Sequence, residues 1–208
     1  MLNMDERTLA DVLDRFYETS RRYKDQTLGD FEKRQAPLLL PKLPTVKLSP
    51  ELEYFYSWYH CDIIVGSAGV AITSFDGLER RQEGFASFST DLGKTMQPNP
   101  AWNQQWTVFA DVNDNPIVAD VGTAKTPVLA AIEAVDYEVV APSLASFFRM
   151  LTEMMEVTAS LKTQQPTSED IEVLIAFREE VEIPATLKRL REVVDSSYVR
   201  AWGHFLYS

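Results

Sequence analysis

The segment 106–120, WTVFADVNDNPIVAD, decides the fold class of this chain. Two runs rich in valine, isoleucine and aromatic side chains, the composition typical of strands, flank the polar triplet at residues 113–115. Asparagine and aspartate tolerate the left-handed backbone that tight turns need. The segment therefore predicts a β-hairpin that turns at residues 113–115.

Further short apolar runs lie on both sides of this hairpin. They are DIIVG (62–66), VAITS (70–74), TPVLAAI (126–132) and YEVVA (137–141). Because the runs are closely spaced, with no helical segment between them, they favour an antiparallel meander over βαβ units. The glycines of GSAG (66–69) lack the spacing of a phosphate-binding loop, so we interpret them as a turn.

Apolar spacings of three and four residues predict helices before and after these strands. The first covers about residues 4–24, and a second begins at Ser49–Pro50, with the hydroxyl as cap and the proline at the first helical position. A strong amphipathic helix covers 143–161, and helical segments follow from about residue 169, with a restart at Pro184. The proline-rich segment 36–50 predicts an extended strap over the domain; a ligand for a proline-binding domain is the alternative.

These elements predict an α+β fold: an antiparallel sheet of about four to six strands packed by flanking helices, with extra N- and C-terminal helices. We expect one domain over residues 1–165. Residues 166–208 then form a helical extension packed on that domain or on a second copy. Tyr198, Trp202 and Phe205 share one helical face, so we expect them to be at least half covered, by the domain or in a homodimer.

The charge balance limits the partners of the protein. The 208 residues include 31 acidic and 20 basic side chains, a net charge of -11. Most of the excess lies in residues 61–160, where 13 acids stand against 5 bases. Nucleic-acid binding needs clustered lysine and arginine and is disfavoured, whereas a basic protein partner fits.

Few residues are available for metal binding or nucleophilic catalysis. Cys61 is the one cysteine, so no intramolecular disulfide can form and a reducing compartment is expected. His60 and Cys61 are neighbours on a predicted strand, where successive side chains point to opposite faces, so we expect Cys61 to be structural. Residues 111–115 superficially resemble a calcium loop, but Pro116 and Gly122 stand where glycine and glutamate are needed. A small hydrolase using a carboxylate pair stays open as an alternative.

The sequence also bears on location. No stretch approaches the ~20 apolar residues of a membrane helix. Residues 1–14 carry acids where a signal peptide has basic residues, and no apolar segment follows. We therefore expect a cytoplasmic protein that does not bind membranes.

From about residue 50 to 157, the order of elements resembles the SUKH superfamily, which includes bacterial toxin-immunity proteins and a yeast cell-wall-synthesis regulator. In that family a tryptophan-led hairpin with a Gly-Asp-Pro-Ile-like turn precedes a final helix of the type "sF..fL". The matching positions here are Trp106, Asp114, Pro116, Ile117, Asp120, Val128, Ser146, Phe147 and Leu151. Asn115–Pro116 stands where Asp-Pro is commoner, and a His-Gly after the third strand is missing.

The resemblance implies a non-enzymatic protein-binding domain, most simply an immunity protein of a toxin–antitoxin pair, with no cofactor. Family immunity proteins neutralise toxins, often nucleases, by direct binding, and nuclease toxins are usually basic. We therefore expect a basic partner such as a toxin domain. The candidate contact residues are Asp76, Glu79, Asp111, Asp114 and Asp120. The alternative is an intracellular regulatory or scaffold protein that acts through its C-terminal helices.

Overall fold

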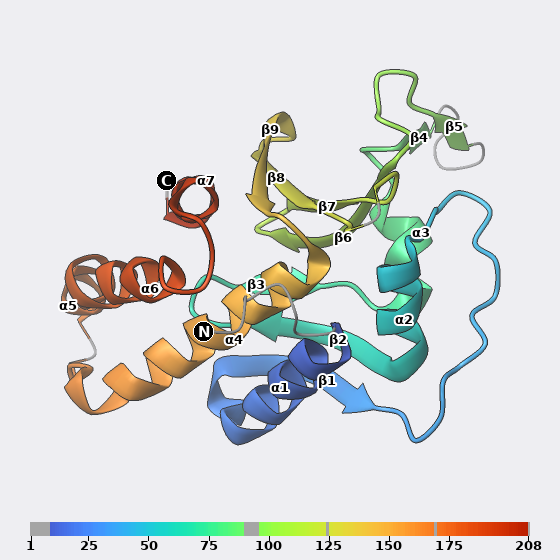
Figure 1. The fold of residues 1–208 in the computed structure, drawn as a ribbon. Coiled ribbons are helices and arrows are strands. Elements are labelled where there is room, and N and C mark those ends of the chain that lie inside the picture. Colours follow the sequence, from blue (N-terminus) through green and yellow to red (C-terminus); the bar gives the residue numbers. More distant parts are fainter. Residues whose placement is uncertain (1–8, 90–95, 124, 169, 208) are drawn as a thin grey trace.

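The computed structural model describes residues 9–89, 96–123, 125–168 and 170–207 and has an α+β fold (Figure 1). Seven strands form one antiparallel sheet in the order β1-β2-β3-β6-β7-β8-β9, so the predicted meander is confirmed. Their bounds are β1 Thr27–Lys33, β2 Tyr59–Val65, β3 Val70–Ile72, β6 Trp106–Val112, β7 Asn115–Asp120, β8 Val128–Ile132 and β9 Val135–Ala141. β4 (Ser87–Ser89) and β5 (Met96–Pro98) form a separate pair.

The sheet is one strand wider than the four to six strands predicted, because the sequence analysis missed β1. This strand stands at the end of the sheet, and Phe31 is its one buried residue. Its sequence TLGDFEK therefore lacks the apolar alternation that identifies a half-buried strand.

The predicted hairpin is confirmed, with a tighter turn than the triplet suggested. Val112 pairs with Asn115, so Asn113 and Asp114 alone form the turn. Their φ angles are 50° and 64°, the left-handed pair that a two-residue hairpin loop requires. Gly66 and Gly69 of the GSAG turn also have positive φ, as a turn between β2 and β3 demands.

Helices lie where the sequence predicts them, and the short helix α3 is an addition that was not predicted. They are α1 Leu9–Arg22, α2 Pro50–Trp58, α3 Leu78–Arg81, α4 Leu144–Leu161, α5 Ile171–Phe177, α6 Ile183–Leu190 and α7 Ser196–Tyr207. The Ser49 hydroxyl accepts a hydrogen bond from the Leu52 amide, and Ser143 accepts one from Ser146, so side-chain caps start α2 and α4. One π-helical turn, Arg178–Glu182, joins α5 to α6. Residues 4–8 of the first predicted helix lie outside the described residues.

The main core lies where α1, α2 and α4 cover one face of the sheet (Figure 1). Phe148 of α4 stands at its centre, with ring centroids 5.1 Å from Phe16 of α1 and 4.8 Å from Phe55 of α2. Trp202 of α7 joins the same core: it is fully buried, and its indole N–H points to the Met154 sulfur at 3.3 Å. Phe205 is buried as well and Tyr198 is mostly covered, so the predicted coverage of the last helix is confirmed within one chain. These rings therefore need no second copy of the chain to cover them.

On the opposite face of the sheet, the described residues form an apolar cluster over β6–β9. Val108, Val118 and Leu129 form a second, smaller cluster there, closed by the partly buried rings of Phe85, Trp102, Trp106 and Tyr137. Gln82 ties this covering segment to the sheet: its amide donates to the Val108 carbonyl at 2.8 Å and accepts from the Val108 N–H at 3.0 Å. These two bonds satisfy the backbone where the β6–β7 register shifts.

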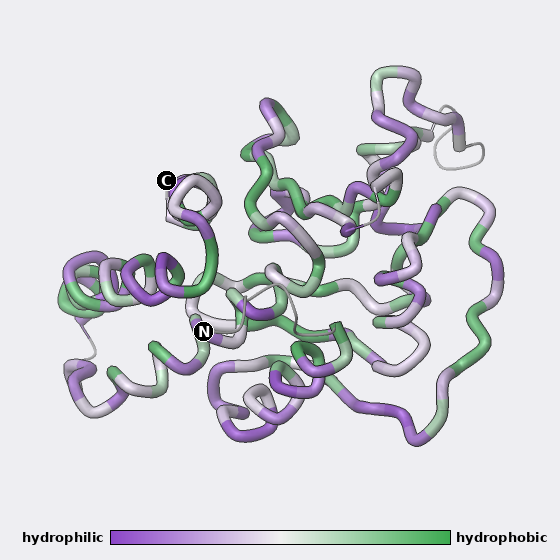
Figure 2. The backbone as a smooth tube through the Cα atoms, in the orientation of Figure 1, coloured by the Kyte–Doolittle hydropathy of each residue, from purple (hydrophilic) through white to green (hydrophobic). Residues whose placement is uncertain are grey.

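The proline-rich strap has no helix or strand between residues 34 and 49 of the described chain. Val46 is buried, and Leu40, Leu43 and Leu48 pack on the core. Thr107 of β6 donates a hydrogen bond of 2.6 Å to the Lys47 carbonyl. The start of the strap is hydrogen-bonded to the end of α2: the Arg34 amide donates to the Trp58 carbonyl at 2.8 Å, and the Leu38 amide donates to the Ser57 carbonyl at 2.9 Å. The Leu39 side chain is nevertheless 93% exposed, and Figure 2 shows the apolar stretch around it on the outer loop.

Glu153 of α4 is a deeply buried charged side chain of the helical layer. Glu153 of α4 is 1% exposed, and its carboxylate contacts Arg15 of α1 at 3.0 Å and Arg189 of α6 at 2.7 Å. A buried carboxylate is costly unless it is paired and hydrogen-bonded. Glu153 therefore fixes how α1 and α6 lie against α4.

We expect Glu153→Gln to lower the free energy of unfolding by about 1–3 kcal/mol, because two arginines lose the charge that they share in a buried position. Glu156→Gln is the matched control, since Glu156 also contacts Arg15 but is 31% exposed, and we expect it to cost below ~1 kcal/mol. Urea unfolding measures both. Equal losses for the two variants would contradict the role of Glu153.

Candidate partner-binding surface

Two of the predicted acids meet at the β6–β7 turn. Asp111 is 8% exposed and forms an ion pair with Arg81 of α3. It also accepts a hydrogen bond of 3.2 Å from the backbone N–H of Asp114. The Asp114 side chain is almost fully exposed and lies 3.7 Å from the same arginine. Asp111 is thus neutralised and holds the turn, whereas Asp114 faces solvent.

The other three predicted acids lie outside this turn. Asp76 is exposed in the short turn that leads into α3, and Glu79 accepts hydrogen bonds from the amide and hydroxyl of Thr45 at 3.4 and 3.2 Å. Asp120 pairs in register with Trp106, at the opposite end of the hairpin from the turn, and accepts from the Gly122 amide at 3.0 Å. Asp111 and Asp114 thus lie at the turn of the hairpin, Asp120 at its other end, and Asp76 and Glu79 in α3 and the turn before it.

We expect Asp111→Asn to lower the free energy of unfolding by about 1–3 kcal/mol, because Arg81 loses its buried partner. Asp114→Asn is the control: asparagine keeps the left-handed turn, and an exposed ion pair contributes below ~1 kcal/mol. Thermal or urea unfolding distinguishes the two. If Asp111→Asn proves as harmless as Asp114→Asn, Asp111 belongs to a free acidic surface after all.

A second acidic surface, which the sequence analysis missed, lies on the outer face of β1–β3. In the β1–β2 register Leu28 pairs with Ile64, Asp30 with Asp62 and Glu32 with His60. Paired residues of an antiparallel sheet share a face, and the intervening residues Phe31, Cys61 and Ile63 point into the core. We call this surface the acidic sheet face; it consists of Leu28, Asp30, Glu32, His60, Asp62, Ile64 and Ala71.

The acidic sheet face combines uncompensated charge with exposed apolar area. Asp30 and Asp62 are both exposed and lie directly opposite each other, and no ion pair between described residues involves either. Like charges in this position destabilise a sheet. Beside them Leu28 is 71% exposed and Ile64 40% exposed. Like-charged residues and exposed apolar side chains thus lie side by side on this face.

A groove of about 620 Å³ runs along this face. Leu28, Asp62 and Ile64 line one side, and Arg80 and Arg81 of α3 line the other together with Asp111. The groove thus joins the acidic sheet face to the Arg81–Asp111 pair.

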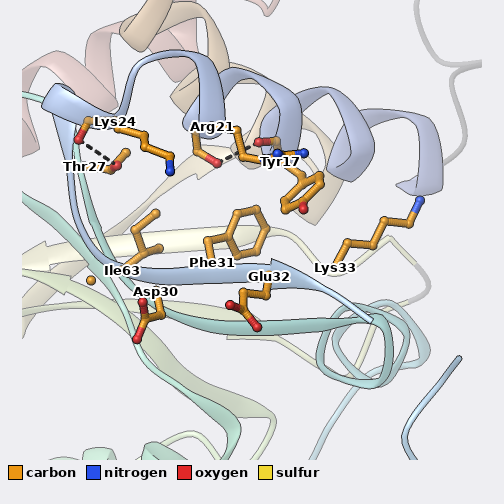
Figure 3. Close-up of a pocket in the computed structure, with 11 residues that line it drawn as sticks. Tyr17, Arg21, Lys24, Thr27, Asp30, Phe31, Glu32, Lys33 and Ile63 are labelled. Atoms are coloured by element: carbon orange, nitrogen blue, oxygen red, sulfur yellow. Dashed lines mark hydrogen bonds between the residues drawn. The ribbon is translucent and has the colours of Figure 1, made fainter. Parts of the chain in front are cut away.

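A separate cavity of about 540 Å³ lies between α1 and β1 (Figure 3). Phe31 and Ile63 point into it, whereas Asp30 and Glu32 point to the other side of β1. Arg21 and Lys24 line its rim; the Arg21 guanidinium lies 5.5 Å from the centroid of the Tyr17 ring. The two sides of β1 therefore carry opposite charge, basic towards α1 and acidic on the outer face.

Gly29 is required for this strand geometry. Its φ is +97°, and a Cβ at this position would lie 2.2 Å from the Asp62 carbonyl oxygen. No other residue fits without displacing β2. Gly29 therefore fixes the close approach of β1 to β2 that sets Asp30 opposite Asp62.

The residues weighed for catalysis do not come together. Cys61 is buried, and burial raises the pKa of its thiol well above the usual value. His60 points to the outer face, as the alternation of strand side chains requires. Among the described residues, no three His, Cys, Asp or Glu side chains gather closely enough to hold a metal ion. No helix in the described part of the chain has the length and apolarity to cross a membrane.

We expect Cys61 to resist alkylation by iodoacetamide in the native protein at neutral to mildly alkaline pH, because the reactive thiolate is disfavoured by burial and the sulfur is covered. In urea the same cysteine should react as a free thiol. Mass spectrometry measures both. Native labelling as fast as labelling in urea would show that the sulfur is accessible.

Comparison of the chain with protein-family models, curated proteins and solved structures finds no match. The likeness to the SUKH superfamily therefore rests on the sequence pattern alone.

Proposed function

We propose that this protein is a binding module that engages a basic protein partner through the acidic sheet face. The observation that carries the proposal is the exposed pair Asp30–Asp62, two acidic residues opposite each other in the β1–β2 register that form no ion pair with the described residues, beside exposed Leu28. A lysine or arginine of a partner relieves the repulsion that the free protein bears. The net charge of -11 supports the same class of partner.

The partner class that we propose is a toxin domain, with this protein as its immunity protein. The SUKH-like order of elements and the acidic surface both support that role. Neutralisation by direct binding needs neither a cofactor nor a catalytic group in this chain. Three of the acids predicted from the sequence are also proposed as contact residues, because their side chains reach solvent. Asp76 and Asp114 are exposed, and Asp120 is partly exposed.

Charged and apolar side chains affect different steps of binding. Exposed charges speed association and make it depend on salt, whereas buried anchors lengthen the life of the complex. On this surface the negative charge comes from Asp30, Glu32 and Asp62. The apolar area that a partner can bury beside the groove comes from Leu28 and Ile64. A partner with a basic rim and a central apolar side chain fits both.

The test compares two variants with equal loss of charge, Asp30→Asn/Asp62→Asn and Asp136→Asn/Glu138→Gln, where the second pair lies exposed on β9. The binding partners are toxin-like proteins encoded next to the gene, used as purified domains. We expect the first variant to associate more slowly than wild type by about threefold or more at low salt, and the difference to shrink at high salt. Stopped-flow or surface-plasmon kinetics measures this.

Unfolding of the same variants provides a second readout. Removal of the like-charged pair should leave stability unchanged or raise it by about 0.2–1 kcal/mol. Slower binding without lost stability identifies functional acids. If Asp30→Asn/Asp62→Asn associates like wild type at both salt concentrations, or no more slowly than the β9 variant, the assignment of this surface is wrong.

A further inference from the structure

The helix α5 carries the most exposed apolar surface of any described helix. Ile171 is 71% exposed, Ile175 49%, Leu174 42% and Val173 41%, and no residue of α5 is buried. Ile171, Leu174 and Ile175 follow the three- and four-residue spacing that places side chains on one helical face. Figure 2 shows these hydrophobic residues at the far left end of the molecule, away from the sheet.

The surroundings of this stripe are acidic. Asp170, Glu172, Glu179 and Glu180 are all exposed, and no ion pair between described residues involves them. Arg178 is the cation in this stretch, and its guanidinium lies over the Tyr207 ring of α7, 5.9 Å from the centroid. The rim of the stripe is thus negative.

A stripe of this kind is complementary to the apolar face of an amphipathic helix of a partner. α5 is two turns long, about 10 Å, and presents anchors at positions i, i+3 and i+4, the pattern read by helix-to-helix docking. Exposed apolar area of this density on a soluble protein marks an interaction site.

We propose that α5 docks an amphipathic helix with a basic flank, supplied by another protein. Two copies of this chain paired through α5 would bring the acids of both rims together, with Arg178 already held at Tyr207, so like-charge repulsion opposes a homodimer here. A helix that carries leucines towards the stripe and lysines towards the rim satisfies both the apolar and the charged parts. The α5 surface is separate from the acidic sheet face, so this inference does not depend on the proposed function.

The test uses the full chain labelled with ¹⁵N and two short synthetic helical peptides, one built of leucine and lysine and the other of leucine and glutamate. We expect the leucine–lysine peptide to shift the amide signals of residues 171–177, and the leucine–glutamate peptide to leave them unchanged. Ile171→Gln/Ile175→Gln keeps helix-forming side chains and should weaken binding of the leucine–lysine peptide by about tenfold or more.

Two controls separate the contributions. Leu38→Gln/Leu39→Gln removes exposed apolar side chains from the strap and should bind the peptide like wild type. Asp30→Asn/Asp62→Asn removes charge from the acidic sheet face and should also retain the α5 signal changes. Failure of the proposed function would leave this result intact, and the reverse holds as well.

Three outcomes would overturn the inference. The first is that the leucine–lysine peptide binds without shifting the amide signals of α5, or binds Ile171→Gln/Ile175→Gln as tightly as wild type. Attraction by charge alone then explains the binding. The second is equal binding of the leucine–glutamate peptide. The third is a dimer of the free wild-type protein in sedimentation that Ile171→Gln/Ile175→Gln dissociates, since a second copy then covers α5.

Discussion

The fold depends on how a seven-stranded sheet is covered: the helices cover one face, and the opposite face is covered over β6–β9. A seven-stranded sheet has two faces, and a face left bare exposes every second side chain of its strands. In this protein α1, α2 and α4 cover one face, with fully buried Phe148 at the centre of the contact. On the opposite face the segment tied down by Gln82 covers β6–β9. The outer face of β1–β2 is left to side chains that tolerate water.

This division explains where polar and charged groups lie. On β2 the core side carries Cys61, Ile63 and Val65, while the outer side carries His60, Asp62 and Ile64. Antiparallel sheets often face water on one side, and a charged edge also opposes pairing with another chain. A water-facing strand pair does not need two aspartates opposite each other, however, nor a leucine that is 71% exposed. Solvation accounts for the polarity of this face, and the opposed aspartates and the exposed leucine are the features on which the proposed binding role rests.

Local sequence signals carried most of the fold prediction. The turn residues Asn113 and Asp114 and the capping serines Ser49 and Ser143 act on their own immediate neighbours, so their effect can be predicted without knowledge of the tertiary structure. β1 was not predicted because an edge strand with one buried residue lacks the apolar alternation that identifies a strand. The acidic sheet face was not predicted for a related reason. The Asp30–Asp62 pair exists only once the register of two strands 32 residues apart is known, and the neutralisation of Asp111 depends on an arginine from α3.

The same reasoning explains why the two proposed contacts differ in kind. A sheet face is held by its neighbours: Gly29 fixes β1 against the Asp62 carbonyl, so the backbone positions that carry Asp30 and Asp62 are set before a partner arrives. α5 is supported mainly at one end, where the π-helical turn joins it to α6 and Glu182 accepts hydrogen bonds from Ser67 and Thr158 at 2.7 and 2.8 Å. A surface held at one end can adjust to its partner but must lose conformational entropy in doing so. The acidic sheet face therefore suits fast, charge-guided recognition, and the apolar stripe of α5 suits a contact whose strength comes from burial after the partners have met.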